Sequence, residues 1–329
     1  MSNIEGEFPL HQAASAGEVD VVNDLLAKGA DKDKTNKKGN TALIQAAKYG
    51  QFEVLCYLEA QGADKDKGNK NGTTALIHAA QAGHFELLQY LVEQGADKEK
   101  ANKNGKTPLI HAAHAGHLEV LQYLVEQGAD KDKASNRGTT ALMHAALKGH
   151  LEALRYLVEQ GADKDKATNS GTTALMWAAQ NGHFRVLEFL LEDGVDLTKI
   201  KTDGRTALHL AAQQGHADIL SILMAYGASL TARTTDGRLP IDVAANEAIR
   251  VLIHDEPRRR TDHGHKRAVI PDPDIEQASK RPRLEVEGRS SSSSSSATAT
   301  ATSSDDGVHE EGKVASEDED SEPSSEEED

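Results

Sequence analysis

The chain of 329 residues contains a single cysteine, Cys56, and aromatic residues make up only 4% of it. One cysteine excludes an intramolecular disulfide and any zinc site built from several thiolates. No apolar stretch is long enough to suggest a transmembrane helix, and the first ten residues, MSNIEGEFPL, lack the apolar run of a signal peptide. We therefore expect a protein of a reducing, intracellular compartment. At its repeat position Cys56 corresponds to Gln89, Gln122 and Arg155, which predicts an exposed thiol.

Recognisable catalytic motifs are also missing. No glycine-rich phosphate loop, Ser/His/Asp arrangement or cysteine nucleophile motif stands in a fitting context. Fifteen histidines are present, but those at one repeat position, such as His78, His111 and His144, would lie one helix spacing of about 8–10 Å apart. Zinc holds each nitrogen at about 2.0–2.1 Å, so histidines at that spacing cannot share an ion. We predict no enzymatic activity, no cofactor and no metal site.

The sequence does contain a strict internal period. A turn glycine recurs every 33 residues, at Gly6, Gly39, Gly72, Gly105, Gly138, Gly171, Gly204 and Gly237. Within one period, Thr107-Pro108 is typical of a helix start, and Gly116 and Gly128 are typical of the ends of two short helices. Helices this short are not stable alone, so the units are expected to stack and bury their apolar faces against one another.

The residues of this unit resemble the ankyrin repeat family. The resemblance lies in T-P-L-I-H-A-A at Thr107–Ala113, G-H-L-E-V-L at Gly116–Leu121 and G-A-D at Gly128–Asp130, and it covers roughly residues 4–254. It implies an all-α ankyrin-repeat solenoid of helix-turn-helix units with β-hairpin connections. The array spans residues 1–254 in eight units counting both caps, near 4–36, 37–69, 70–102, 103–135, 136–168, 169–201, 202–234 and 235–254.

Several positions depart from the internal pattern or from the family. Asp24 stands in the first unit where Tyr57 and Tyr90 stand in later ones, which predicts that this end face meets water. The last unit, GRLPIDVAANEAIRVLI, lacks the Gly-His turn, and we expect its second helix to be shortened. Ile or Met replaces the family's usual histidine after Thr-Pro-Leu in five units. We expect the stability of these units to depend more on apolar packing. Histidine is kept there only at His11 and His209.

The Gly-His pairs form a second histidine row. We expect these histidines to satisfy backbone groups at the turn between the two helices of a unit, rather than to bind a ligand. They are His84, His117, His150, His183 and His216.

Because ankyrin repeats usually bind partners on their concave side, the resemblance also implies a partner-binding surface. Carried over by position, this surface comprises Lys37, Lys38, Lys48, Tyr49, Lys70, Asn71, Lys103, Asn104, Lys106, His114, Asn136, Arg137, Leu147, Lys148, Gln180, Asn181, Arg205, Gln213 and Gln214. Its first half is basic, which favours a protein partner with an acidic segment. Nucleic acid is disfavoured because acidic residues are interleaved along every connection and stacking aromatics are scarce. The alternative is that the Lys–Asp alternation only keeps the loops soluble.

Composition changes abruptly after the repeats. Residues 255–289 form a basic, proline-containing linker, and residues 290–329 form a Ser-rich and acidic tail that we expect to be disordered. Lys266 and Arg267, followed after twelve residues by Lys280, Arg281 and Arg283, resemble a bipartite signal for an import receptor. Ser316, Ser324 and Ser325 resemble acidic-directed phosphorylation sites.

Together these features predict a non-catalytic adaptor or scaffold that binds a protein partner on the concave ankyrin face, in the nucleus and shuttling with the cytoplasm. They bear some likeness to nuclear ankyrin-repeat regulators such as the NF-kappa-B inhibitor group and gankyrin. The alternative is a histone, basic-protein or assembly chaperone that acts through its acidic tail. No membrane association is expected.

Overall fold

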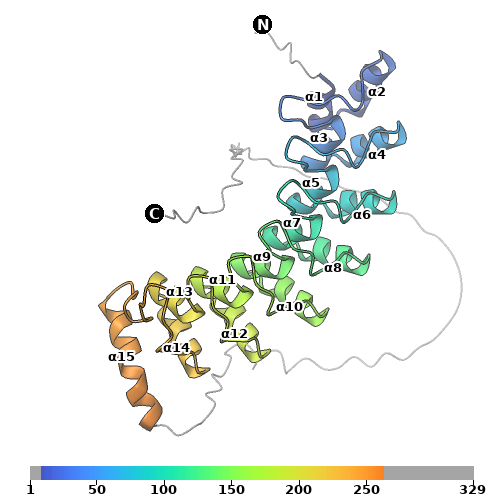
Figure 1. Cartoon of the computed structure of the whole chain (residues 1–329). Helices are drawn as coiled ribbons and strands as arrows, with labels where there is room; N and C mark the ends of the chain where they lie inside the picture. The colour runs from blue at the N-terminus through green and yellow to red at the C-terminus, as the bar shows by residue number, and fades with distance from the viewer. Residues whose placement is uncertain (1–8, 263–329) are drawn as a thin grey trace, which may run out of the picture. The chain divides into compact units, whose positions relative to one another are not determined.

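Pairs of short antiparallel helices make up the protein. The computed structural model describes residues 9–262, in which fifteen helices and no strand are present. One helix of each pair lies on the concave side of the bend and the other on the convex side, as Figure 1 shows. The inner helices are α1 (Pro9–Ala16), α3 (Ala42–Lys48), α5 (Ala75–Ala82), α7 (Pro108–Ala115), α9 (Ala141–Lys148), α11 (Ala174–Asn181) and α13 (Ala207–Gln214). The outer helices are α2 (Val19–Ala27), α4 (Phe52–Ala60), α6 (Phe85–Glu93), α8 (Leu118–Glu126), α10 (Leu151–Glu159), α12 (Phe184–Glu192) and α14 (Ala217–Ala225).

The predicted helix boundaries are confirmed. The hydroxyl of Thr107 accepts a hydrogen bond from the backbone N–H of Ile110, and Pro108 occupies the first turn of α7. Gly116 ends that helix with φ +79°, a left-handed conformation that disfavours residues with a side chain. A Cβ at Gly116 would also lie 2.6 Å from the imidazole of His150, so this turn requires glycine on two counts.

A continuous apolar core runs through the stack. Pairs of alanines on the inner helices, such as Ala112 and Ala113, are fully buried, and their small size lets neighbouring helices approach closely. On the outer helices leucines fill the space, and Leu121 and Leu124 are completely buried. The Ile and Met residues that replace the family's usual histidine are at most 1% exposed, as the departure from the pattern predicted; they are Ile44, Ile77, Ile110, Met143 and Met176.

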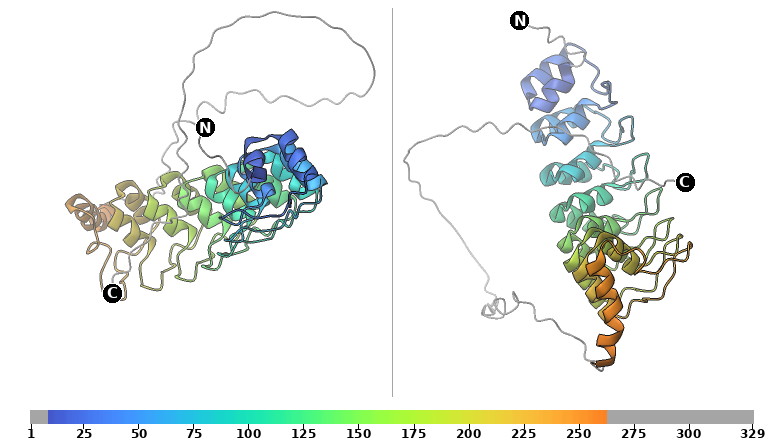
Figure 2. Two further views of the ribbon diagram at one scale, coloured as in Figure 1. Left: turned by 90° about the horizontal axis from the view of Figure 1, so that it is seen from above. Right: turned by 90° about the vertical axis from the view of Figure 1, so that its left-hand side faces the viewer.

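The connections between units are tight hairpin loops without regular strand. In the loop before α7, the side-chain oxygen of Asn102 accepts hydrogen bonds from the backbone N–H groups of Asn104 and Lys106. Successive loop tips are joined by one backbone hydrogen bond each, such as Lys103 N–H to Asn71 C=O at 2.8 Å and Asn136 N–H to Asn104 C=O at 2.9 Å. The loops therefore form a row beside the inner helices, which Figure 2 shows from two further directions.

The Gly-His pairs link neighbouring units, which extends the role predicted for them. Each imidazole bonds through Nε2 to the carbonyl at the end of the preceding inner helix, and because a carbonyl only accepts, Nε2 carries the proton. His183, for example, donates to Leu147 at 2.9 Å, and His150 donates to His114 at 3.1 Å. These carbonyls are among those that a helix end leaves without an internal partner. The histidines thus cap the C-terminal ends of the inner helices and join one unit to the next.

The two end units differ from the rest. Asp24 on α2 is exposed, so the first outer helix does present a water-facing side. The prediction of a shortened second helix in the last unit is wrong. Turns at residues 240–243 replace the inner helix, and α15 (Glu247–Asp262) is the longest of the described helices, passing the predicted array boundary at residue 254. Earlier outer helices stop before a glycine, and the corresponding position here is Arg260, so no such stop exists.

The prediction of an exposed thiol also needs correction. Cys56 is half-buried, because the outer helices pack side by side and Tyr90 of α6 reaches back onto α4. The ring of Tyr90 meets that of Phe52 edge-on, with centroids 5.7 Å apart, and its hydroxyl donates to Glu59. Burial raises the pKa of the Cys56 thiol and, together with the nearby Cys56 and Glu59, raises the pKa of Tyr90 to about 12. Both groups are therefore neutral at physiological pH.

Candidate functional site

The predicted partner-binding residues lie on the hairpin loops and on the C-terminal halves of the inner helices. The loop tips hold exposed basic and amide side chains, namely Lys37, Lys38, Lys70, Asn71, Lys103, Asn104, Asn136 and Arg137. The helix ends hold Tyr49, Lys148, Asn181, Gln213 and Gln214 exposed, with Lys48, His114, Leu147 and Gln180 half-buried. The geometry thus brings residues from six successive units onto the concave side. Tyr49, with 51% of its surface exposed, is an exposed large hydrophobic residue among them.

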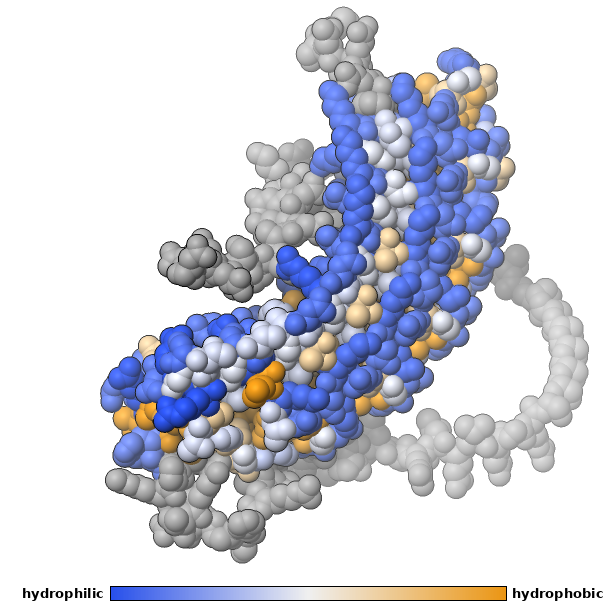
Figure 3. All heavy atoms as spheres, in the orientation of Figure 1, coloured by the Kyte–Doolittle hydropathy of each residue, from blue (hydrophilic) through white to orange (hydrophobic). Residues whose placement is uncertain are grey.

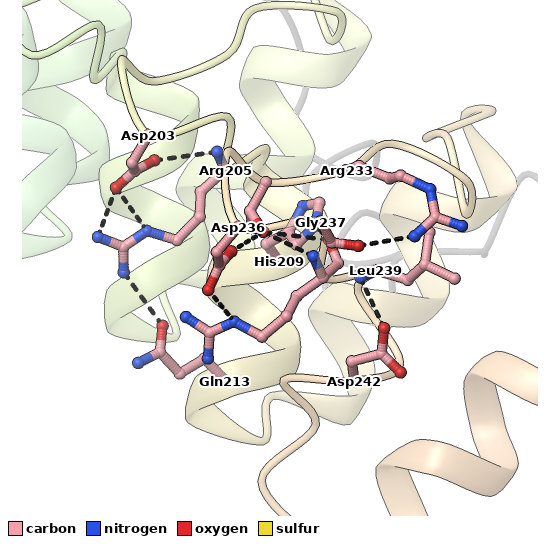
Figure 4. Close-up of polar contacts among 11 residues, drawn as sticks. Asp203, Arg205, His209, Gln213, Arg233, Asp236, Gly237, Leu239 and Asp242 are labelled. Atoms are coloured by element: carbon pink, nitrogen blue, oxygen red, sulfur yellow. Dashed lines mark hydrogen bonds and ion pairs between the residues drawn. The ribbon is translucent and has the colours of Figure 1, made fainter.

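The basic character of this surface belongs to its N-terminal half. In the seventh unit, Arg205 pairs with Asp203 at 2.6 Å and donates to Gln213 at 3.3 Å, as Figure 4 shows. Burial favours a raised pKa for Asp203, but hydrogen bonds from Arg205 and the charges of Lys201 and Arg205 outweigh it and hold the pKa below its usual value. Arg205 and Gln213, both predicted to contact a partner, are therefore hydrogen-bonded to each other. Arg205 is also paired with the carboxylate of Asp203.

His209 and His11, the two histidines that stand at the family's usual histidine position, each form a hydrogen bond to the following loop. His209 Nδ1 bonds to the hydroxyl and backbone N–H of Thr206, while Nε2 donates to the carbonyl of Arg238 in the next loop at 3.3 Å. At the other end of the array, His11 donates to the carbonyl of Asn40 at 2.9 Å. Burial lowers the pKa of both imidazoles, so they are neutral hydrogen-bonding groups at pH 7.

The Lys–Asp alternation in the connections has a structural role that the sequence interpretation missed. The carboxylate of Asp132 accepts the backbone N–H of Asp163 in the next unit at 2.9 Å, and Lys166 donates to the carbonyl of Asp132 at 2.6 Å. The same acidic position accepts from the following unit at Asp33, Asp66, Glu99 and Asp165. We call this row the acidic ladder. The regular 31-residue offset between its partners was visible in the sequence but had no meaning without the loop geometry.

We expect the acidic ladder to contribute measurably to stability. Replacing Asp132 with Ala should lower the free energy of unfolding by about 0.5–1.5 kcal/mol, because one backbone N–H of the next unit loses its acceptor. Asp132→Asn keeps a side-chain oxygen in place and should lose less. Urea unfolding of the two variants and the parent, followed by circular dichroism, measures the difference. Equal loss in both variants would show that the charge matters and the hydrogen bond does not.

The loop tips and the acidic ladder run along the array as two separate rows. Figure 3 shows hydrophilic ridges with a paler strip between them. The ladder's acidic side chains accept hydrogen bonds from backbone N–H groups of the next unit, whereas the lysines of the loop tips are exposed. The acidic residues of the loops therefore have a structural role besides keeping the loops soluble.

One contact on the concave side was not predicted. Nδ1 of His114, at the end of α7, lies 3.1 Å from Nδ1 of His144 in α9. The two residues are 30 positions apart and occupy different repeat positions, so the 33-residue period aligns His144 with His78 and His111 but not with His114. Burial lowers the pKa of His111 to about 3 and lowers the pKa of His144 well below its usual value, with the charge of Lys106 adding to both effects.

Other kinds of site are not formed by this part of the chain. No group of three or more His, Cys, Asp or Glu residues lies in a metal-binding arrangement within residues 9–262. None of the helices described there is both long and apolar enough to cross a membrane. The predicted import residues Lys266, Arg267, Lys280, Arg281 and Arg283 and the predicted phosphorylation sites Ser316, Ser324 and Ser325 lie outside the described residues and stay predictions, as does the disordered tail.

Comparison with known protein families gives one match. A model described as "Ankyrin repeats (3 copies)" matches residues 1–69, 58–135, 130–201 and 194–261. These matches overlap end to end and cover well over half of the chain. Comparison with curated proteins gives no match, so the likeness to the NF-kappa-B inhibitor group and gankyrin stays a prediction.

Proposed function

The chain belongs to the ankyrin repeat family, and we propose that it is a non-catalytic adaptor that binds the acidic segment of a protein partner on its concave face. Ankyrin repeats are protein–protein interaction modules, and each unit adds a loop and a helix end to one extended surface. The proposed compartment is the nucleus, with exchange to the cytoplasm. Its support is the spacing of the two basic clusters between residues 266 and 283.

One observation carries the proposal. The loop tips of the second to fifth units present Lys37, Lys38, Lys70, Lys103 and Arg137, while the acidic residues beside them are engaged in the acidic ladder. A row of like charges on successive rigid units attracts an extended segment of opposite charge and raises its association rate. Exposed single pairs contribute at most about 1 kcal/mol each, so binding must be multivalent along the row.

Site-specific photo-crosslinking tests the location of binding. A photoreactive amino acid is placed at Tyr49 and Lys103 on the concave side and, as matched controls, at the exposed ends of two outer helices, Gln94 and Gln127. In nuclear extract, the full chain should crosslink one protein from the concave positions and not from the outer ones. Reversing the charge of Lys70, Lys103 and Arg137 should abolish that product. Crosslinking from the outer helices alone would contradict the proposal.

Tail truncation separates the adaptor from the chaperone alternative. A chain ending at residue 289 lacks the thirteen acidic residues found after Ser303. An adaptor keeps its crosslinked partner after this truncation, because the contact lies on the repeats. A chaperone that acts through the acidic tail loses histones or other basic proteins with it. Loss of the partner on truncation, with the concave variants unaffected, would favour the chaperone.

A further inference from the structure

Trp177, the only tryptophan of the chain, lies on the inner helix α11 and was not among the residues predicted to contact a partner. Its side chain packs against the core, yet the residue is only half-buried. In the two neighbouring units the same repeat position holds His144 and Leu210, each only 2% exposed. The sixth unit therefore presents part of a large aromatic residue to solvent at a position that its neighbours bury.

Contacts of the equivalent histidines show where this repeat position lies. In α7, Nε2 of His111 is 3.4 Å from Nδ2 of Asn102, which belongs to the hairpin loop of the same unit. In α9, Nδ1 of His144 is 3.1 Å from Nδ1 of His114 at the end of the preceding inner helix. The position thus lies between a loop and a helix end of the preceding unit, the two kinds of element that line the concave side.

The repeat carries the second of these contacts over to Leu147 and Trp177. They stand at the repeat positions of His114 and His144, with the same offset of 30 residues, and their helices α9 and α11 pack directly against each other. Leu147 is half-buried, and its carbonyl accepts a hydrogen bond from His183 that fixes this helix end. Between successive inner helices of residues 9–262, no other unit pairs two apolar residues at these positions.

Polar groups beside this apolar pair favour a ligand with oxygen acceptors. The hydrogen bonds that Trp177 makes within residues 9–262 involve its backbone, so its indole N–H can donate to a ligand. Lys148, which follows Leu147 at the end of α9, is exposed and adds a positive charge. A donor and a cation favour carboxylate or carbonyl oxygens, whereas the apolar surfaces of Trp177 and Leu147 gain free energy when another apolar group covers them.

We propose that Trp177 and Leu147 bind one apolar side chain of the acidic segment, while the indole N–H and Lys148 bind oxygen atoms that flank it. The proposal rests on the proposed function, because it assigns the residue that determines specificity within the concave face. Basic loop tips recur from unit to unit and cannot fix the register of a bound segment. A tryptophan contact that occurs once fixes that register, and tryptophan is among the residues that carry most binding energy at interfaces.

Tryptophan fluorescence tests this contact directly, because Trp177 is the only tryptophan. The full chain is titrated with a glutamate-rich peptide that carries one leucine at its centre, and with the same peptide carrying glycine there. The leucine peptide should bind about tenfold more tightly, since it buries one more apolar side chain. It should also move the emission to shorter wavelength by covering the indole. Equal affinity of the two peptides, or emission that the leucine peptide does not shift, overturns the proposal.

Variants taken from the chain's own repeats test the two residues separately. Trp177→His introduces the residue found at His144, and Leu147→Gln introduces the residue found at Gln180, so each suits its place in the repeat. By calorimetric titration, each variant should reduce the difference in affinity between the two peptides to less than about twofold. The matched control Gln45→His makes the same kind of replacement at the equivalent position of α3 and should keep the tenfold difference. Circular dichroism checks that all three variants are folded.

Failure of this contact and failure of the proposed function give different results. If the preference for the leucine peptide persists in Trp177→His and Leu147→Gln, the contact is wrong. Crosslinking of the parent chain from Tyr49 and Lys103 would then still uphold an adaptor that binds on its concave face. If those positions crosslink nothing and neither peptide binds, both the contact and the proposed function are rejected.

Discussion

Replacing Leu121 with Ala should lower the free energy of unfolding by about 2–5 kcal/mol, since it leaves a cavity between helices that cannot collapse fully. Leu121 is fully buried on α8, within the continuous core of the stack. Each unit contacts only its neighbours, so a cavity in the fourth unit weakens the interfaces on both sides of it. Urea unfolding followed by circular dichroism measures the loss.

The matched control lies on the same helix. Glu119 is exposed on α8, and Glu119→Ala should change the free energy of unfolding by less than about 0.5 kcal/mol. The comparison isolates burial from any effect on the helix itself, because Ala favours helix at both positions. A loss below about half a kcal/mol for Leu121→Ala would mean that the helix faces another way than the structure shows.

The regular parts of the fold could be predicted from the sequence because each carries a local signal repeated many times. Thr107, Gly116 and Gly128 fix the helix ends by capping and by backbone conformation, and the 33-residue period shows that the same signals recur. The last unit could not be predicted in this way. That unit has no glycine at position 260, so no such residue ends α15 there, and the helix is longer than predicted. A helix end is predicted from the residue that causes it, and here that residue is absent.

The candidate site was predictable in position but not in its chemistry. Repeat spacing alone places Lys103 and Arg137 on successive loop tips. It does not show that Arg205 pairs with Asp203, because that contact depends on side-chain conformations within one loop. Nor does it show the contact between His114 and His144, which joins two different repeat positions on adjacent helices. Contacts between different repeat positions become visible only in the three-dimensional structure.

His111 and His144 should make the array less stable in acid. Burial lowers the pKa of His111 to about 3 and lowers that of His144 well below its usual value, while an unfolded histidine titrates near 6.5. Between those values the unfolded chain binds protons that the folded chain does not. The free energy of unfolding therefore falls as the pH drops below about 6.5, by at most about 1.4 kcal/mol per pH unit for each such histidine.

Among the groups of residues 9–262 that act on these two histidines, no acidic group offsets this effect. The groups that act on His111 are Lys106, His114 and His78, and those that act on His144 are Lys106, His114, His111 and Lys148. Every one of them is positive or becomes so in acid, so protonating either ring adds repulsion to the cost of burying its charge. The lowered pKa of His11 and of His209 works in the same direction at the two ends of the array.

The chain itself supplies the substitution that tests this. Leu210 occupies in α13 the position that His111 and His144 occupy in α7 and α9, and it is 2% exposed, so leucine fits this place in the repeat. The double variant His111→Leu, His144→Leu should lose less stability than the parent between pH 7 and pH 5, with the difference growing toward pH 5. Urea unfolding at half-unit pH steps measures both curves. Parallel curves would mean that these two imidazoles titrate in the folded protein as they do in the unfolded chain, and that their surroundings do not keep them neutral.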